Sequence, residues 1–183
     1  MAMFIDDRTS GEFSMATKKR LSQEERRLRN RYKIQQVEHP KEIDSLSDVF
    51  VTFKQNWSHP IMDWVQGYKT TVLDSDNKPI CNIYFEPNAP LRDEHIKMLF
   101  TIILENFSDA KSVMIARNHA GKAMEPDQTE KETASKFKNY GQSIGLPVAD
   151  QFVVSPLGMY KFKEQDYATL TNAGKQNDKF VAF

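Results

Sequence analysis

The amino-acid sequence predicts a mixed α/β domain in which helices cover a β-sheet on at least one face. Two observations support this fold class. Residues 68–85 follow a period of two around a polar turn, as a β-hairpin does. Residues 92–107 place apolar side chains three and four positions apart, as a helix covering a sheet does. Strand-like and helical stretches alternate again after residue 110, and 183 residues suffice for one such core with extensions.

The N-terminal part of the chain predicts helices. Residues 1–17 mix turn-forming residues with isolated apolar ones, so we expect a flexible tail there. The segment 18–36 carries eight basic residues against two acidic ones. Ser22 precedes Glu25 by three positions, which is the spacing of a capping box and predicts a short basic helix from about Ser22 to Tyr32. An apolar stripe with helical spacing then predicts a packing helix through Ile43, Leu46, Val49, Phe50 and Phe53.

The hairpin and the helix that follows it are predicted in more detail. We expect one strand through Leu73, a polar turn from Asp74 to Lys78, and a returning strand from Ile80 to Phe85. The next helix places apolar residues on a single face that would cover the sheet. These residues are Ile96, Leu99, Phe100, Ile103 and Leu104.

The C-terminal half predicts further strands around one more helix. Residues 111–116 read as a short buried strand, and a loop follows from Arg117 to Gln128. Residues 129–145 predict a helix whose end is marked by Gly141 and Gly145. A final hairpin is expected from strands at 148–155 and 159–162, joined by a turn at 156–158. We expect Phe137 and Tyr140 of the helix to face the core.

Composition narrows the function classes. Lysine plus arginine equals aspartate plus glutamate at 25 each, so the chain as a whole has no basic field for nucleic acid. The single cysteine, Cys81, excludes an intrachain disulfide and a thiolate zinc cluster, and it fits a reducing cytosol. No apolar run approaches the roughly 18 residues that a membrane span requires. We therefore expect a cytoplasmic protein without a membrane partner.

Several separated motifs resemble a known family. "TVLDSDNKPI", "VMIARNHAG", "MEPDQTE", "YGQSIGLPVADQFVVS" and "MYKF" together resemble the RadC-like branch of the JAB/MPN domain, over about residues 63–162. The resemblance implies a cytidine-deaminase-like mixed sheet flanked by helices, here with a basic helical extension before it. It also suggests a division of the chain into a flexible tail (1–17), an N-terminal helical extension (18–60), the domain (61–165) and a C-terminal tail (166–183).

The resemblance also implies a zinc site, which this chain alters. Active members bind zinc through two histidines and an aspartate, and these positions fall on Arg117, His119 and Glu130. Three protein ligands and one open position lower the pKa of a bound water to about 7. Arg117 carries a permanent positive charge and cannot bind a divalent metal. Because two ligands do not normally hold zinc, we expect no metal and no cofactor.

The remaining catalytic positions are altered as well. The family's serine falls on Asp127, and its glutamate base falls on or near Gln66, whose amide cannot accept a proton from water. Arg117 and Asn118 are expected in the cleft. We expect Arg117 to reach Asp127 or Glu130 and to fill the space of the metal with an ion pair.

The other histidines and the tryptophans carry structural expectations. His39, His59 and His95 are expected as surface or capping residues, since neither spacing nor sequence places them beside the cleft. Trp57 and Trp64 are expected to seal the N-terminal helix against the sheet.

Three function classes follow. The first, which we favour, is a catalytically degenerate binding or scaffold module for a protein partner, in the DNA-repair or mobile-element setting that the resemblance implies. The second is a zinc-dependent peptidase or isopeptidase with an altered site around His119 and Glu130. The third is nucleic-acid binding within residues 18–33. The sheet edges also allow a homodimer. The residues expected to contact nucleic acid are Lys18, Lys19, Arg20, Arg26, Arg27, Arg29 and Arg31.

Overall fold

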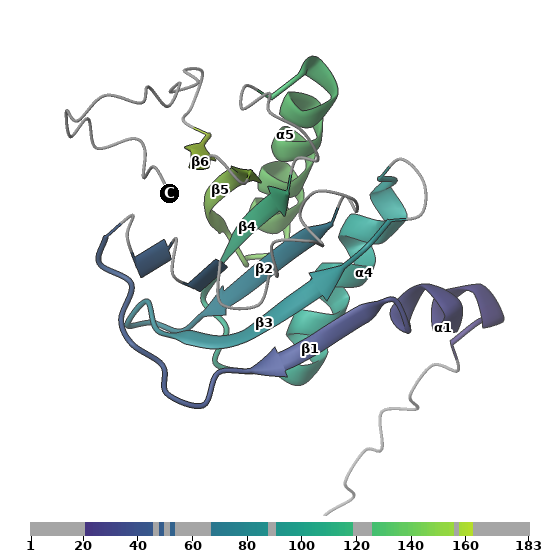
Figure 1. The fold of residues 1–183 in the computed structure, drawn as a ribbon. Coiled ribbons are helices and arrows are strands. Elements are labelled where there is room, and N and C mark those ends of the chain that lie inside the picture. The colour runs from purple at the N-terminus through teal and green to yellow at the C-terminus, as the bar shows by residue number, and fades with distance from the viewer. Residues whose placement is uncertain are drawn as a thin grey trace, which may run out of the picture.

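A computed structural model describes residues 21–45, 48–49, 52–53, 67–87, 91–118, 126–155 and 158–162. Within them, six strands form one mixed sheet in the order β1-β3-β2-β4-β5-β6, and helices cover it (Figure 1). This architecture confirms the predicted fold class. The strands are β1 (Tyr32–Gln36), β2 (Tyr68–Leu73), β3 (Pro79–Phe85), β4 (Ser112–Asn118), β5 (Val148–Ser155) and β6 (Gly158–Lys161), and the helices are α1 (Gln23–Arg29), α4 (Asp93–Asn106) and α5 (Gln128–Ser143).

The predicted hairpin forms the centre of the sheet. β2 pairs antiparallel with β3 on one side and with β4 on the other. The turn is fixed by Asp74, whose Oδ1 accepts the backbone N–H groups of Asp76 and Lys78 at 2.8 and 2.9 Å. Asn77 takes a positive φ of 56°, which asparagine tolerates better than most residues. The parallel pair β4–β5 and the antiparallel pair β5–β6 complete the sheet.

Two apolar layers cover the two faces of the sheet. Alternate residues of β4 belong to different layers: Val113 and Ile115 pack in the layer that includes α4, whereas Met114 and Ala116 pack in the other. Figure 1 shows α4 and α5 behind the sheet. The opposite layer contains Val49 and Phe53, which are buried.

The predicted packing helix is confirmed where it is described. Residues 48–49 and 52–53 are helical. Val49 and Phe53 are 4% and 0% exposed, as their spacing predicts, and Ile43 packs against the same cluster. Leu46 and Phe50 lie outside the described residues.

The predicted basic helix is shorter than expected. The capping box of Ser22 and Glu25 is present, but α1 ends at Arg29 and Tyr32 starts β1 instead of closing the helix. The ring of Tyr32 stacks on Phe85 at 4.5 Å, and its hydroxyl donates to the carbonyl oxygen of His95 at 2.7 Å. Sheet pairing and this packing override the local helical tendency. The segment assigned to the N-terminal extension therefore contributes the edge strand of the sheet.

Helix α4 buries most of its predicted face, with one correction. Leu104 is 52% exposed, so the prediction that it shares the covering face is wrong. The buried arc also includes Met98 and Ile102, and at 100° per residue Leu104 falls just beyond the edge of that arc at Phe100.

The predictions for the histidines outside the cleft have different outcomes. His95 is 4% exposed, so a surface position is wrong, but its Nδ1 accepts the N–H of Arg92 at 2.9 Å, which confirms capping. Burial, helped by the charge of Arg92, lowers the pKa of His95 and favours the neutral ring. His39 is exposed, as predicted. The other residues in these predictions, His59, Trp57 and Trp64, lie outside the described residues.

One predicted end of α5 is confirmed, whereas a second predicted end and the end of β4 differ from the prediction. Gly145 follows the helix with φ +76°, as expected for a terminating glycine. Gly141 does not mark an end, because it lies inside α5, where an added Cβ would come 2.6 Å from the carbonyl oxygen of Leu146. β4 continues past Ala116 to Asn118, so Arg117 lies in a strand and not in the predicted loop.

Among the described residues, no helix is both long and apolar enough to cross a bilayer.

Candidate functional site

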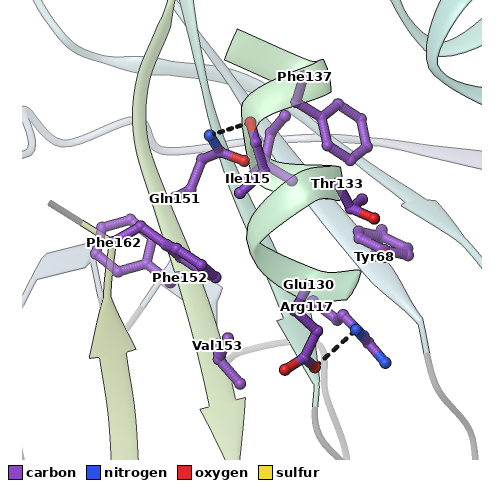
Figure 2. A pocket seen from close by; sticks show the side chains of 11 residues that line it. Tyr68, Ile115, Arg117, Glu130, Thr133, Phe137, Gln151, Phe152, Val153 and Phe162 are labelled. Atoms are coloured by element: carbon purple, nitrogen blue, oxygen red, sulfur yellow. Dashed lines mark hydrogen bonds and ion pairs between the residues drawn. The ribbon is translucent and has the colours of Figure 1, made fainter. Parts of the chain in front are cut away.

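The end of β4 and the start of α5 bring Arg117 and Glu130 together. Nη1 of Arg117 lies 2.6 Å from Oε1 of Glu130, and the two side chains are 17% and 2% exposed. Figure 2 shows the pair below the first turns of α5, beside the sheet. The predicted ion pair is thus present, with Glu130 as the partner.

The second oxygen of Glu130 is also engaged. Oε2 accepts the backbone N–H of Asp127 at 2.8 Å, and Oδ1 of Asp127 accepts the N–H of Glu130 at 2.8 Å. This reciprocal pair is a capping box that starts α5. The Asp-x-x-Glu spacing is visible in the sequence, and it is the same signal that identified Ser22 and Glu25. The capping role of Asp127 and Glu130 was not predicted.

The ion pair lines a small, mainly apolar cavity. Its volume of about 20 Å³ is enough for about one water molecule. Phe137 and Phe152 supply apolar walls from α5 and β5. The ring of Tyr68 lies 5.9 Å from Cζ of Arg117, within the range of a cation–π contact.

Burial controls the electrostatics of this cavity. Nε of Arg117 is buried and has no hydrogen-bond partner among the described residues. Burial raises the pKa of Tyr68; the charge of Arg117 acts against this, and the carboxylates of Glu130 and Asp127 act with it. The phenol therefore stays protonated at neutral pH and supplies no negative charge.

Three polar residues that line the cavity were missed by sequence reasoning: Tyr68, Thr133 and Gln151. Nε2 of Gln151 donates to the carbonyl oxygen of Ala134 at 2.8 Å and so fastens β5 to α5. The available signal was spacing, since Glu130, Thr133 and the buried Phe137 follow at three and four positions on one helix face.

Asn118 follows Arg117 in β4 but makes different contacts. It is fully buried, its Oδ1 accepts the N–H of Gly67 at 2.5 Å, and its own N–H donates to the carbonyl of Gly67 at 3.2 Å. Asn118 thereby holds the start of β2 against the end of β4. It is not among the residues that line the cavity.

The described residues do not fit a zinc ion. Arg117, where the resemblance puts one ligand, carries a guanidinium, and both carboxylate oxygens of Glu130 already accept a hydrogen bond or form an ion pair. Asp127 is exposed and caps α5. His119 and Gln66 lie outside the described residues, and among the residues that are described no group of three metal-binding side chains occurs.

Basic residues also lie on α1 and in the turn that follows it. Arg26, Arg27 and Arg31 are exposed, whereas Nη1 of Arg29 lies 2.5 Å from Oε2 of Glu105 on α4. The remaining predicted contacts, Lys18, Lys19 and Arg20, lie outside the described residues.

Comparison with known proteins agrees with the fold. The model of the family described as "RadC-like JAB domain" matches residues 68–167, which is more than half of the 183 residues. No curated protein matches the chain. The match begins at the first residue of β2 and includes both members of the Arg117–Glu130 pair. With its mixed sheet, covering helices and this match, the chain belongs to the RadC-like JAB domain family.

Proposed function

We propose that this chain is a catalytically degenerate RadC-like JAB domain that acts as a binding module for a protein partner. One observation supports the loss of catalysis above all others. The buried ion pair between Arg117 and Glu130 occupies two of the three positions where the resemblance puts metal ligands.

The ion pair is costly to open. A zinc ion would have to take Glu130 from both Arg117 and the N–H of Asp127. Arg117 would then stay largely buried without a counter-ion, and uncompensated buried charges of this kind cost on the order of 3 kcal/mol. The guanidinium cannot lose its proton to relieve that cost. The pair thus favours a cleft without the hydrolytic ion.

A protein partner is the proposed ligand because the fold keeps a surface near the cleft. Arg117 retains 17% exposure and lies against an aromatic ring, and side chains of that kind are common at the centre of protein interfaces. The resemblance suggests a DNA-repair or mobile-element setting for the partner.

Zinc stoichiometry tests the loss of catalysis. We expect the purified full chain to carry far less than one zinc per molecule by mass spectrometry, with no change in His119→Ala. The matched comparison is the double variant Arg117→His with Glu130→Asp, which restores the family's ligands. One zinc per chain that disappears in His119→Ala, together with amide hydrolysis, would establish the alternative of a metal-dependent peptidase or isopeptidase.

Site-specific photo-cross-linking tests the protein-binding role. A photoreactive residue at Thr133, which lines the cavity, is expected to trap one specific protein in cells. The same residue at the exposed Ser108, between α4 and β4, is the control and is expected to trap none. Equal labelling from both positions, or nucleic acid as the trapped species, would count against the proposal.

Nucleic-acid binding through α1 is the second candidate. It is favoured by the exposed side chains of Arg26, Arg27 and Arg31, which form no ion pair with another described residue. Binding of this type weakens steeply with salt. A triple substitution of these arginines by glutamine should remove that dependence, and the variant Lys111→Gln, at an exposed residue before β4, is the control. Unchanged binding in the triple variant would exclude these three arginines as the contact.

A further inference from the structure

β1 forms an open edge of the sheet. Among the described residues, β1 pairs only with β3, and no other strand lies along its outer side (Figure 1). Its residues after Tyr32 are all exposed, including the apolar Ile34 at 45%. Such an edge presents unpaired backbone groups to any strand of suitable shape.

The register shows which backbone groups face outward. The N–H of Val37 donates to the carbonyl of Ile80, which continues the register in which Tyr32 faces Phe85. In an antiparallel ladder, residues that bond a given neighbour alternate along the strand. Lys33 and Gln35 therefore bond β3 as Val37 does. The N–H and C=O groups of the other strand residues point to the open edge, and these residues are Tyr32, Ile34 and Gln36.

We propose that β1 pairs antiparallel with β1 of a second copy of this chain, around a two-fold axis that passes beside Ile34. Ile34 then faces Ile34 of the second copy, and Tyr32 faces Gln36. The outward groups form six backbone hydrogen bonds, two for each of three facing pairs. The two six-stranded sheets become continuous, and the exposed Ile34 side chains cover each other on one face.

Charge and strand length select this register. More than one facing pair of outward residues forms within β1 only if the axis lies beside Lys33, Ile34 or Gln35. An axis at Lys33 sets two ammonium groups directly opposite each other, which is unfavourable. An axis at Gln35 leaves Tyr32 facing a residue beyond the strand. Only the axis at Ile34 pairs all five residues of β1.

The flanking charges complement each other in the same register. Glu38 follows β1 of one copy at the end where Arg31 precedes β1 of the other. Glu38 and Arg31 are exposed and form no ion pair with another described residue. Opposite charges therefore flank both ends of the paired strands. This favours a second copy over an unrelated strand.

Sedimentation of the full chain over a concentration series tests the proposal. We expect a reversible monomer–dimer equilibrium. Ile34→Pro removes an N–H that points away from β3, so it should leave the β1–β3 ladder intact. It should raise the dissociation constant of the dimer at least tenfold. Ile34→Val keeps the N–H and an apolar side chain, and it should retain the dimer. Circular dichroism and thermal unfolding verify that both variants fold.

Disulfide trapping tests the register itself. Facing residues of a hydrogen-bonded pair have Cα atoms about 5.5 Å apart, within disulfide range. Ile34→Cys should therefore form a covalent dimer under mild oxidation. Gln36→Cys is the matched control, because the two copies of residue 36 are offset by four residues, or about 13 Å along the strands. The native Cys81 is buried and should contribute no background.

Three results would overturn the proposal: a wild-type chain that is monomeric at every concentration, a dimer that persists in Ile34→Pro, and trapping at residue 36 in preference to 34. Loss of a different protein partner in Ile34→Pro, with a monomeric wild type, would assign the edge to that partner instead. β3 and β2 separate β1 from Arg117 on β4, so the presence or absence of the dimer leaves the proposed function at Arg117 and Glu130 untouched.

Discussion

Two buried cations lie on neighbouring strands, and the protein holds them in different ways. Arg117 on β4 faces the layer of α5 and is neutralised by Glu130 at 2.6 Å. Lys69 on β2 faces the opposite layer and is 2% exposed. Its Nζ donates to the carbonyl oxygens of Thr52 and Phe53 at 2.6 and 3.2 Å. No described carboxylate forms an ion pair with Lys69.

The difference follows from the chemistry of the two side chains. A guanidinium stays charged at any ordinary pH, so burial of Arg117 requires a negative partner. An amine can lose its proton, and burial lowers the pKa of Lys69 to about 8. Neutral Lys69 can still donate to the carbonyl groups near Phe53, whose ring lies 5.8 Å from Nζ. An ion pair thus accommodates Arg117 in the interior, whereas a lowered pKa and hydrogen bonds to carbonyl groups accommodate Lys69.

The largest effect is expected when the partner of Arg117 is removed. Glu130→Gln leaves the guanidinium buried without a counter-ion and weakens the capping box of α5, so the free energy of unfolding should fall by about 3–5 kcal/mol. Urea denaturation measures this loss. The double variant Arg117→Met with Glu130→Gln should recover most of it. A loss below about 1 kcal/mol in the single variant would mean that the pair is open to solvent.

A smaller loss is expected when Arg117 keeps its charge but loses its shape. Arg117→Lys retains the attraction to Glu130 but not the planar group beside Tyr68, and we expect a loss of about 1–2 kcal/mol. Thermal unfolding of this variant beside Glu130→Gln separates charge from geometry. Equal losses in the two variants would show that charge alone does not hold the site together.

Lys69 should make stability depend on pH in the opposite sense to a paired cation. Its pKa is about 8 in the folded chain and 10.5 in the unfolded chain. Between these values the unfolded state binds more protons, so stability rises with pH. From about pH 7.5 to pH 9, the free energy of unfolding of the wild type should rise by about 1 kcal/mol relative to that of Lys69→Met. A difference that stays constant or falls over this window would mean that Lys69 remains charged in the folded chain.

The sequence predicted most of the secondary structure around these cations. The hairpin, α4, α5 and the closing strands follow from local periodicity, because each pattern is set by which face of the element is buried. An ion pair of Arg117 with Asp127 or Glu130 was also predicted, through the family resemblance, and Glu130 is the partner that the structure shows. Their roles as replaced metal ligands remain predictions.

Other features depend on contacts that no local pattern encodes. β1 is a strand because β3 and the ring of Phe85 lie beside it, although its own residues continue a basic, helix-like segment. The burial of Lys69 was not predicted, because it depends on carbonyl groups 16 and 17 residues earlier in the chain. Gly141 resembles a helix terminator, yet the close approach of Leu146 requires it inside α5.

The smallest effect is expected at Tyr68, which lies between the two cations in the fold. Its ring faces Arg117, and the next residue along β2 is Lys69 on the other face. Tyr68→Phe keeps the aromatic surface and removes a hydroxyl that stays neutral, so the free energy of unfolding should change by less than about 0.5 kcal/mol. Tyr68→Leu removes the ring, and its loss should exceed that of Tyr68→Phe by about 1 kcal/mol. The two variants compared by urea denaturation distinguish the ring from the hydroxyl. A larger loss in Tyr68→Phe would show that the hydroxyl, and not the aromatic face, supports Arg117.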